Sequence, residues 1–178
     1  MRGSWLALRC YDEVTARVAG SGLRIEVSGA GAGMVPLDER HLVVRAMRSA
    51  FDRLGGQPPG LEIECTNRIP HGRGLGSSAA AIVSGVILGR ALSDPDTPGG
   101  ELRGTETDLT HAAELEGHPD NVAACLLGGF TVAWSEPGGA ARAIRLEPSP
   151  KIAPIVLVPA GQLATEQARR LLPDTVPH

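Results

Sequence analysis

Alternating apolar and polar positions predict the strands of this chain. Residues 14–18, 23–27 and 61–65 repeat with the period of two that is typical of a strand buried on one face. The first two segments are separated by Gly20-Ser21-Gly22, so we expect them to form an antiparallel hairpin. Residues 130–134 and 152–158 are further candidate strands, and the second is apolar enough to be buried on both faces.

Apolar residues at helical spacing predict the helices. Apolar side chains recur every three or four positions over residues 38–54, and Gly55 follows as a stop, which indicates an amphipathic helix. Residues 77–92 are rich in Ala, Val, Ile and Leu and contain no proline, as in a buried helix. We expect further helices over residues 107–115 and from Asp120, placed as a cap, to the Gly128-Gly129 pair. Strands and helices in mixed order predict an α+β fold, a sheet covered by helices on one side.

Composition and charge are those of one ordinary globular unit. The chain has 178 residues, of which 42% are hydrophobic and 21% charged, and its net charge is −3. This slight acidity gives no electrostatic reason to expect nucleic acid or an anionic membrane as a partner. Neither a leader nor a membrane-length apolar run occurs, so a cytoplasmic location is expected. Cys10, Cys65 and Cys125 lack metal-site or CxxC spacing, and we expect reduced core thiols.

A glycine-rich segment joins the strand at residues 61–65 to the helix at residues 77–92. Its three glycines, Gly72, Gly74 and Gly76, permit positive φ and leave the backbone N–H groups open to one oxyanion. Ser77 and Ser78 follow at the helix start, where free N–H groups and the helix dipole favour phosphate, and where a hydroxyl can also ligate Mg²⁺. The segment is therefore interpreted as a phosphate-binding loop. The alternative is a flexible surface loop capped by serine.

This loop fits neither of the two commonest nucleotide motifs. A Walker A motif requires a lysine after its last glycine, and this loop has none there. The glycine spacing also differs from that of the dinucleotide fingerprint. Residues 70–80 closely resemble the second motif of the GHMP kinases, a family of small-molecule kinases. Glu116-Gly117-His118-Pro119-Asp120-Asn121-Val122-Ala123, with Leu127-Gly128-Gly129, is similar to the homoserine kinase branch in its actinobacterial form.

The resemblance runs from about Leu6 to the last residue and implies a fold and a domain division. The family opens with a strand and a Pro-x-x-x-Asn-Leu-Gly-Pro-Gly-Phe-Asp segment that nothing here matches, and it continues into a second domain beyond the last residue of this chain. The resemblance implies that residues 1–150 are the ribosomal protein S5 domain 2-like N-terminal, ATP-binding domain, without its first strand and first motif. Residues 151–178 would be the truncated start of the C-terminal domain.

The resemblance also implies ATP and Mg²⁺ as cofactors. The positions that would bind the nucleotide are Pro70, His71, Gly72, Arg73, Gly74, Leu75, Gly76, Ser77, Ser78 and Ala79. A loop hydroxyl and an acid before the His118 turn hold Mg²⁺ in the family, which implies Ser78 and Glu114 here, with Glu116 as the competing acid. Ser78, Glu114 and Asn121 are the expected catalytic residues. The structural alternative is that both acids lie on a solvated helix face.

The substrate contacts implied by the resemblance come from two further segments. His118, Asp120 and Asn121 would border the substrate, while Thr165 and Arg169 would grip it, with Arg169 on its carboxylate. Asn121 cannot accept a proton, so catalysis would depend on orientation and electrostatic stabilisation. In the same way, His41 and Val43 are expected at the adenine pocket.

The implied function is ATP-dependent phosphorylation of the L-homoserine hydroxyl in threonine biosynthesis. L-Homoserine is the expected partner, without nucleic acid or membrane, and a homodimer is left open. One alternative is a catalytically inactive GHMP-like fragment that binds a ligand or a protein partner. Another is a kinase for a different small alcohol such as mevalonate, against which Arg169 and the His118 turn argue.

Overall fold

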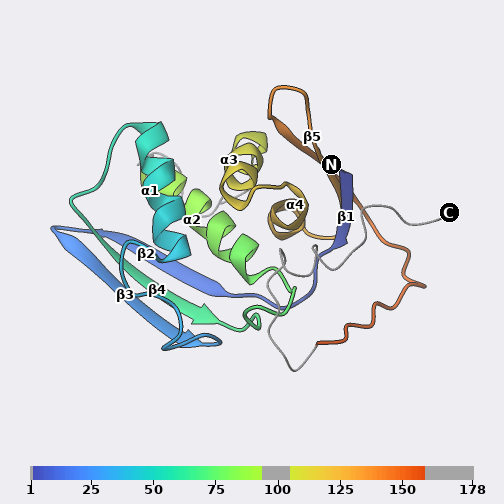
Figure 1. The fold of residues 1–178 in the computed structure, drawn as a ribbon, viewed down its shortest axis with the longest axis horizontal. Helices are drawn as coiled ribbons and strands as arrows, with labels where there is room; N and C mark the ends of the chain where they lie inside the picture. The colour runs from blue at the N-terminus through green and yellow to red at the C-terminus, as the bar shows by residue number, and fades with distance from the viewer. Residues whose placement is uncertain (1, 94–104, 159–178) are drawn as a thin grey trace, which may run out of the picture.

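The computed structural model describes residues 2–93 and 105–158, and the α+β class is confirmed (Figure 1). The elements follow in the order β1 (Arg2–Leu6), β2 (Glu13–Ala19), β3 (Gly22–Gly29), α1 (Leu42–Leu54), β4 (Gly60–Asn67), α2 (Ser77–Ser93), α3 (Glu106–Glu116), α4 (Asp120–Leu127), β5 (Phe130–Ser135) and β6 (Ala141–Leu146). The described residues thus form two sheets and four helices, in place of the single sheet that was expected.

The helices lie between the two sheets, as Figure 1 shows. Helix α1 packs on the sheet of order β2-β4-β3, and Val44, Met47 and Phe51 are buried against Leu61 and Ile63 of its central strand. Helices α3 and α4 pack on the sheet of order β1-β5-β6. Helix α2 contributes to both cores, because its side chains contact α1 on one face and α3 and α4 on another. Each sheet therefore carries helices on one face.

The predicted hairpin is wrong in its pairing, although both of its strands form. Strand β4 lies between β2 and β3, antiparallel to the first and parallel to the second. Its Leu61, Ile63 and Cys65 are all buried, so the central position places the most apolar strand over the core. Gly60 makes the insertion sterically feasible, because a Cβ there would collide with the backbone of Ser21 in the turn between β2 and β3.

Two other expectations need correction, and two strands were missed. Strands β1 and β6 were not predicted, whereas residues 152–158 form no strand, and Ile155 and Leu157 are 87% and 90% exposed. Helix α1 begins at Leu42 and not at residue 38, because the Asp38 carboxylate accepts the backbone N–H of Arg40 at 2.9 Å and closes a turn there. The strand pattern at 152–158 has no pairing strand among the described residues. The proposed domain boundary near residue 150 stays a prediction.

The other helices begin and end as their sequences indicate. Helices α2 and α3 match the expected ranges to within one or two residues. Thr105 and Asp108 form a reciprocal capping box at the start of α3, and Gly117 ends the helix in the left-handed conformation. Gly55 and Gly128 are likewise the C-caps of α1 and α4.

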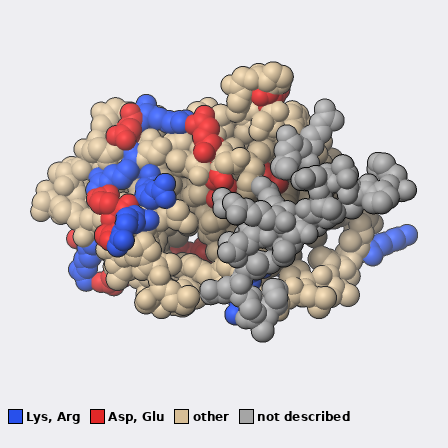
Figure 2. Space-filling view, viewed as in Figure 1, with Lys and Arg blue, Asp and Glu red and all other residues tan. Residues whose placement is uncertain are grey.

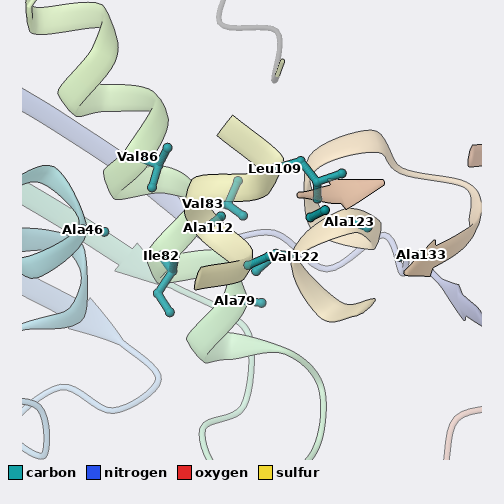
Figure 3. Packing of buried hydrophobic residues seen from close by; sticks show 12 residues of the cluster. Ala46, Ala79, Ile82, Val83, Val86, Leu109, Ala112, Val122, Ala123 and Ala133 are labelled. Carbon is teal, nitrogen blue, oxygen red and sulfur yellow. The ribbon is translucent and has the colours of Figure 1, made fainter. Parts of the chain in front are cut away.

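The contact between α1 and α2 is made by small residues. A Cβ on Gly85 would lie 2.5 Å from the Val43 carbonyl oxygen and 2.6 Å from the Ala46 Cβ, and one on Gly89 would lie 2.7 Å from the Ala50 Cβ. On another face of α2, Ile82, Val83 and Val86 belong to one buried cluster with Leu109 of α3 and Val122 of α4 (Figure 3). Helix α2 is therefore held on both sides, with almost no free volume toward α1.

Charges on the surface occur in mixed groups. On the face shown in Figure 2, basic and acidic side chains lie next to one another on the side of α1. Ion pairs made by α1 include Arg48 with Glu39 and Arg53 with Glu114. None of the helices in the described ranges is long and apolar enough to cross a membrane. All three cysteines are free, but only Cys65 lies in the core, whereas Cys10 and Cys125 are exposed.

Gly85→Ala is expected to destabilise the fold by about 1–3 kcal/mol, because the new methyl group must displace the α1 backbone. In an uncrowded helix the same change stabilises by roughly 1 kcal/mol, so the sign of the effect is diagnostic. Urea unfolding measures it, with Ser84→Ala on the same helix as a control expected within about 0.5 kcal/mol of wild type. A Gly85→Ala protein more stable than wild type would show that this packing is not tight.

Candidate functional site

The glycine loop has the backbone conformation that its sequence predicts. It leaves β4 after Asn67 and reaches α2 at Ser77, and Gly72, Gly74 and Gly76 have φ values of 67°, 72° and 81°. Residues other than glycine rarely adopt this left-handed backbone conformation, so the path of the chain requires glycine at these three positions. The expected positive φ values are thus confirmed, and the turns direct the chain to the N-terminus of α2, where helix N–H groups are free.

A cavity of about 170 Å³ lies beside this loop. Its walls come from the start of α1, the start of α2 and the segment before α1, and the residues that line it include His41, Leu42, Val43, Val35, Pro36, His71, Ser77, Ser78, Ala80 and Ala81. The exposed surface of its wall is mostly apolar, and polar side chains border it both from the loop and from the segment before α1. Such a cavity suits a ligand with a flat apolar part and an anionic part.

His41 is the one histidine in the described ranges with a ring nitrogen buried in the cavity wall and without a hydrogen-bond partner among the described residues. The residue is 6% exposed, precedes α1 directly, and makes no side-chain cap to the helix, and the atom concerned is Nδ1. Burial, helped by the positive charge that His71 can carry, lowers the pKa of His41. A buried polar atom without a partner is costly, and a ligand in the cavity is well placed to satisfy it.

The two candidate acids at the end of α3 point to different places. The Ser78 hydroxyl donates to a Glu116 carboxylate oxygen at 2.8 Å, which joins the start of α2 to the end of α3. Glu114 instead forms an ion pair with Arg53 in the last turn of α1. The sequence favoured Glu114 and kept Glu116 as its competitor, and of the two it is Glu116 that contacts Ser78.

A hydroxyl and a carboxylate are donors of the kind that Mg²⁺ prefers. In the described parts of the chain, no group of three His, Cys, Asp or Glu side chains could hold a metal ion by itself. Ser78 and Glu116 would therefore supply only part of an octahedral shell, and phosphate oxygens and water would supply the rest. This division is usual for magnesium bound together with a phosphate ligand.

The His118 turn lies between α3 and α4 and contains a buried contact. His118 Nδ1 and Asp120 Oδ1 are 2.6 Å apart, and both side chains are largely buried. The expectation that Asp120 caps α4 is wrong, because Pro119 is the N-cap and no side chain caps it, while the Asp120 carboxylate faces the imidazole. Asn121 follows in the first turn of α4 and is half-buried.

The expected site residues do not all take part in the same way. Pro70, Gly72, Arg73, Gly74, Leu75 and Gly76 build the loop without lining the cavity, whereas His71, Ser77 and Ser78 line it. Ala79 is fully buried among the helices, so it contributes packing rather than a ligand contact. Thr165 and Arg169 lie outside the described residues.

Sequence reasoning missed Asp12, Asn67, Val35, Pro36 and Arg40, all of which line the cavity. Asp12 accepts the backbone N–H groups of Arg68 and Ile69, which are more than fifty residues away in sequence. No local pattern signals a contact of that range. Val35 and Pro36 lie outside every pattern that the sequence analysis used, so nothing pointed to them.

Comparison with known proteins gives one consistent result. Residues 41–129, half of the chain, match the family described as GHMP kinases N terminal domain. The homoserine kinase of Streptomyces coelicolor is 60% identical over 174 residues, which cover 97% of this chain and 55% of that relative. The crystal structure of homoserine kinase from Cytophaga hutchinsonii has a TM-score of 0.66 at 30% identity, over 93% of this chain and 52% of the other.

A more distant structural match, L. major mevalonate kinase, has a TM-score of 0.55 at 18% identity, over 81% of this chain and 45% of that one. At that identity the match shows the fold alone. The chain spans about half the length of the curated relatives that it matches.

Lowering the pH is expected to destabilise the fold through two buried histidines. Burial is the main cause that lowers the pKa of His41 and of His111, and the positive charge of Arg53 adds to it at His111. Below about pH 6.5 the unfolded chain takes up these protons more readily than the folded one, so stability present above that pH is lost as the pH falls toward the folded pKa values.

His41→Gln should remove one of these two contributions. The free energy of unfolding, measured in urea at several pH values, should then fall less steeply between about pH 6.5 and 5 than in the wild type. His111→Gln should flatten the same curve, although it also alters the 2.7 Å hydrogen bond to Ser49. Unchanged slopes in both variants would contradict this account.

Proposed function

Because this chain belongs to the GHMP kinase family, we propose that it is the ATP-binding part of a homoserine kinase. The enzyme would transfer the γ-phosphoryl group of ATP to the side-chain hydroxyl of L-homoserine, a step in threonine biosynthesis. The supporting relatives and the structural neighbour at 30% identity are all named homoserine kinases.

One observation carries the proposal: a loop with three left-handed glycines leads into the N-terminus of α2 directly beside an apolar cavity. Adenosine triphosphate has the matching division into a flat apolar base and a chain of anionic phosphates. We assign the base to the cavity, between Val43 and Pro36, and the phosphates to the loop and to Ser77 and Ser78. The N–H groups and the dipole of α2 favour the negative charge.

His41 fits the nucleotide end of this arrangement. Its Nδ1 is buried in the cavity wall, and its lowered pKa keeps the ring neutral at physiological pH. A neutral imidazole can accept or donate one hydrogen bond at the edge of a base without leaving a charge in an apolar cavity.

Ser78 and Glu116 are the residues that would hold Mg²⁺. The metal would neutralise negative charge on the phosphate oxygens during transfer to the acceptor. Glu116 reaches Ser78 from the end of α3, so the two protein ligands come from different helices, and their spacing depends on how α3 packs on α2. Glu114 faces Arg53 instead of Ser78, and we do not assign it this role.

The acceptor would lie near the start of α4, where the His118 turn meets the end of α3. In the reaction the homoserine oxygen forms a bond to the γ-phosphorus, the bond from that phosphorus to the leaving ADP oxygen breaks, and the hydroxyl proton passes to water. Phosphoryl transfer passes through a loose transition state, so proton loss is late and a strong base is not needed. Asp120 would hold the His118 ring in one orientation, and Asn121 would orient the hydroxyl.

Thr165 and Arg169 are proposed as the remaining contacts to the acceptor, and Arg169 would bind the homoserine carboxylate. A cytoplasmic location is part of the same proposal, as expected for an enzyme of amino-acid biosynthesis, and a homodimer stays a prediction.

The chain is expected to bind MgATP, and its melting temperature should rise with MgATP concentration, because a ligand that binds only the folded state stabilises it. Transfer of labelled γ-phosphate is then measured with L-homoserine and with mevalonate as acceptors. Transfer to homoserine supports the proposal, whereas transfer to mevalonate alone would replace the substrate. Nucleotide binding with no transfer to either would indicate a GHMP-like domain that binds ligand without catalysis.

Glu116→Gln should weaken MgATP binding by about tenfold or more, as is typical when a group that supports a bound metal is lost. Glu114→Gln is the matched control: it changes the same residue type two positions away on the same helix and should leave the affinity nearly unchanged. The dissociation constants are measured by calorimetry with Mg²⁺ and again with excess EDTA, where Glu116→Gln and wild type should converge. A larger loss in Glu114→Gln would return the metal site to Glu114.

A further inference from the structure

The entrance of the glycine loop is held by a segment far from it in sequence. One oxygen of the Asp12 carboxylate accepts the backbone N–H of Arg68 at 2.6 Å and that of Ile69 at 2.9 Å. The Cys10 thiol donates to the Arg68 carbonyl at 3.7 Å, and Glu13 forms an ion pair with the Arg68 side chain at 2.8 Å. Residues 10–13 thus contact Arg68 at its N–H, its carbonyl and its guanidinium group.

The Asp12 contacts differ from the other two in strength and in position. Hydrogen bonds that a carboxylate accepts from backbone N–H groups are roughly twice as strong as neutral ones, and they fix main-chain atoms directly. The thiol contact is weak, and the Glu13–Arg68 pair joins two exposed side chains, which contribute little to stability. Asp12 is therefore the principal restraint on the backbone at residues 68 and 69.

These two residues lie at the point where β4 has ended and the loop has not yet begun. Strand β4 is fixed up to Asn67 by its pairing with β2 and β3, and the loop is fixed again at Ser77 by α2. Between them, Gly72, Gly74 and Gly76 supply conformational freedom, which a phosphate-binding loop must lose before its N–H groups can converge on one ligand. A restraint at the entrance reduces the freedom that the ligand must remove.

We propose that Asp12 is a positioning residue of the phosphate-binding loop, which presets the backbone of residues 68–76 for the nucleotide phosphates without itself contacting them. The inference rests on the proposed function, because it assigns the loop to phosphate. Its carboxylate is turned to two N–H donors, so it lines the cavity with its charge already compensated and does not oppose an anionic ligand.

The test compares three variants for binding of MgATP and of adenosine, which has the base but no phosphates. Asp12→Ala should weaken MgATP binding by about tenfold or more, the loss expected when hydrogen bonds to a charged group are removed. Its affinity for adenosine should stay within about twofold of wild type, because the Asp12 carboxylate is turned to the loop backbone and the wall between Val43 and Pro36, to which the base is assigned, is unchanged. Asp12→Asn keeps a neutral acceptor oxygen and should fall between Asp12→Ala and wild type.

Glu13→Gln is the matched control, because it removes a neighbouring carboxylate that contacts the side chain of Arg68 rather than its backbone. It should bind both ligands as the wild type does. Equal losses of MgATP and adenosine in Asp12→Ala, or an unchanged MgATP affinity in a folded Asp12→Ala protein, would overturn the proposal. An Asp12→Asn variant as weak as Asp12→Ala would overturn backbone positioning in favour of a charge effect.

A second measurement is independent of ligand binding. Amide hydrogen exchange of residues 68–76 should be faster in Asp12→Ala than in wild type and unchanged in Glu13→Gln. If the wild-type chain does not bind MgATP, the proposed function fails, and this exchange experiment still decides whether Asp12 restrains the loop. Exchange at wild-type rates in Asp12→Ala would refute the restraint.

Discussion

The close contact of α1 with α2 is the constraint on which the candidate site depends. Gly85 and Gly89 let the two helix backbones approach to distances that a single methyl group would violate. The start of α1 supplies His41 and Val43 to the cavity, and the start of α2 supplies Ser77 and Ser78. The two sets of side chains meet across one cavity only because the helices beneath them lie this close, so the width of the site is set by residues that contact no ligand.

The loop between these helices is fixed by backbone contacts rather than by its own side chains. At its exit, Ala80 N–H donates to the Gly76 carbonyl and begins the hydrogen bonding of α2. At its entrance, Asp12 holds residues 68 and 69, and the neighbouring turn is held where Ala30 N–H donates to the Asn67 carbonyl and Gly31 packs against the His71 ring. A glycine loop can therefore be flexible in composition and still be ordered, because its two ends are tied to strands and a helix.

Local patterns were sufficient for much of this arrangement. The positive φ angles of the loop, the extent of α2 and α3, and strands β2, β3, β4 and β5 all follow from residue type and period over short windows. What the sequence did not reveal was pairing at long range. Nothing in residues 14–27 indicates that β4 will separate the two strands, since that depends on how Gly60 meets Ser21. Asp12 was missed for the same reason, because its contacts are with residues far away in sequence. The apolar run at 152–158 predicted a strand, but no strand among the described residues pairs with it.

The difference between Glu114 and Glu116 is of another kind, because the sequence did contain the signal that separates their positions on α3. Residues on a helix advance by about 100° each, so two positions apart means about 200°, nearly opposite faces. Leu109, Ala112 and Ala113 form the buried face of α3 toward α2, and the next position on that stripe is Glu116. Glu114 lies off the stripe and faces Arg53. An acid that reaches the start of α2 has to stand on the face that packs against α2, so the period that locates the helix core also selects Glu116 as the acid that contacts Ser78.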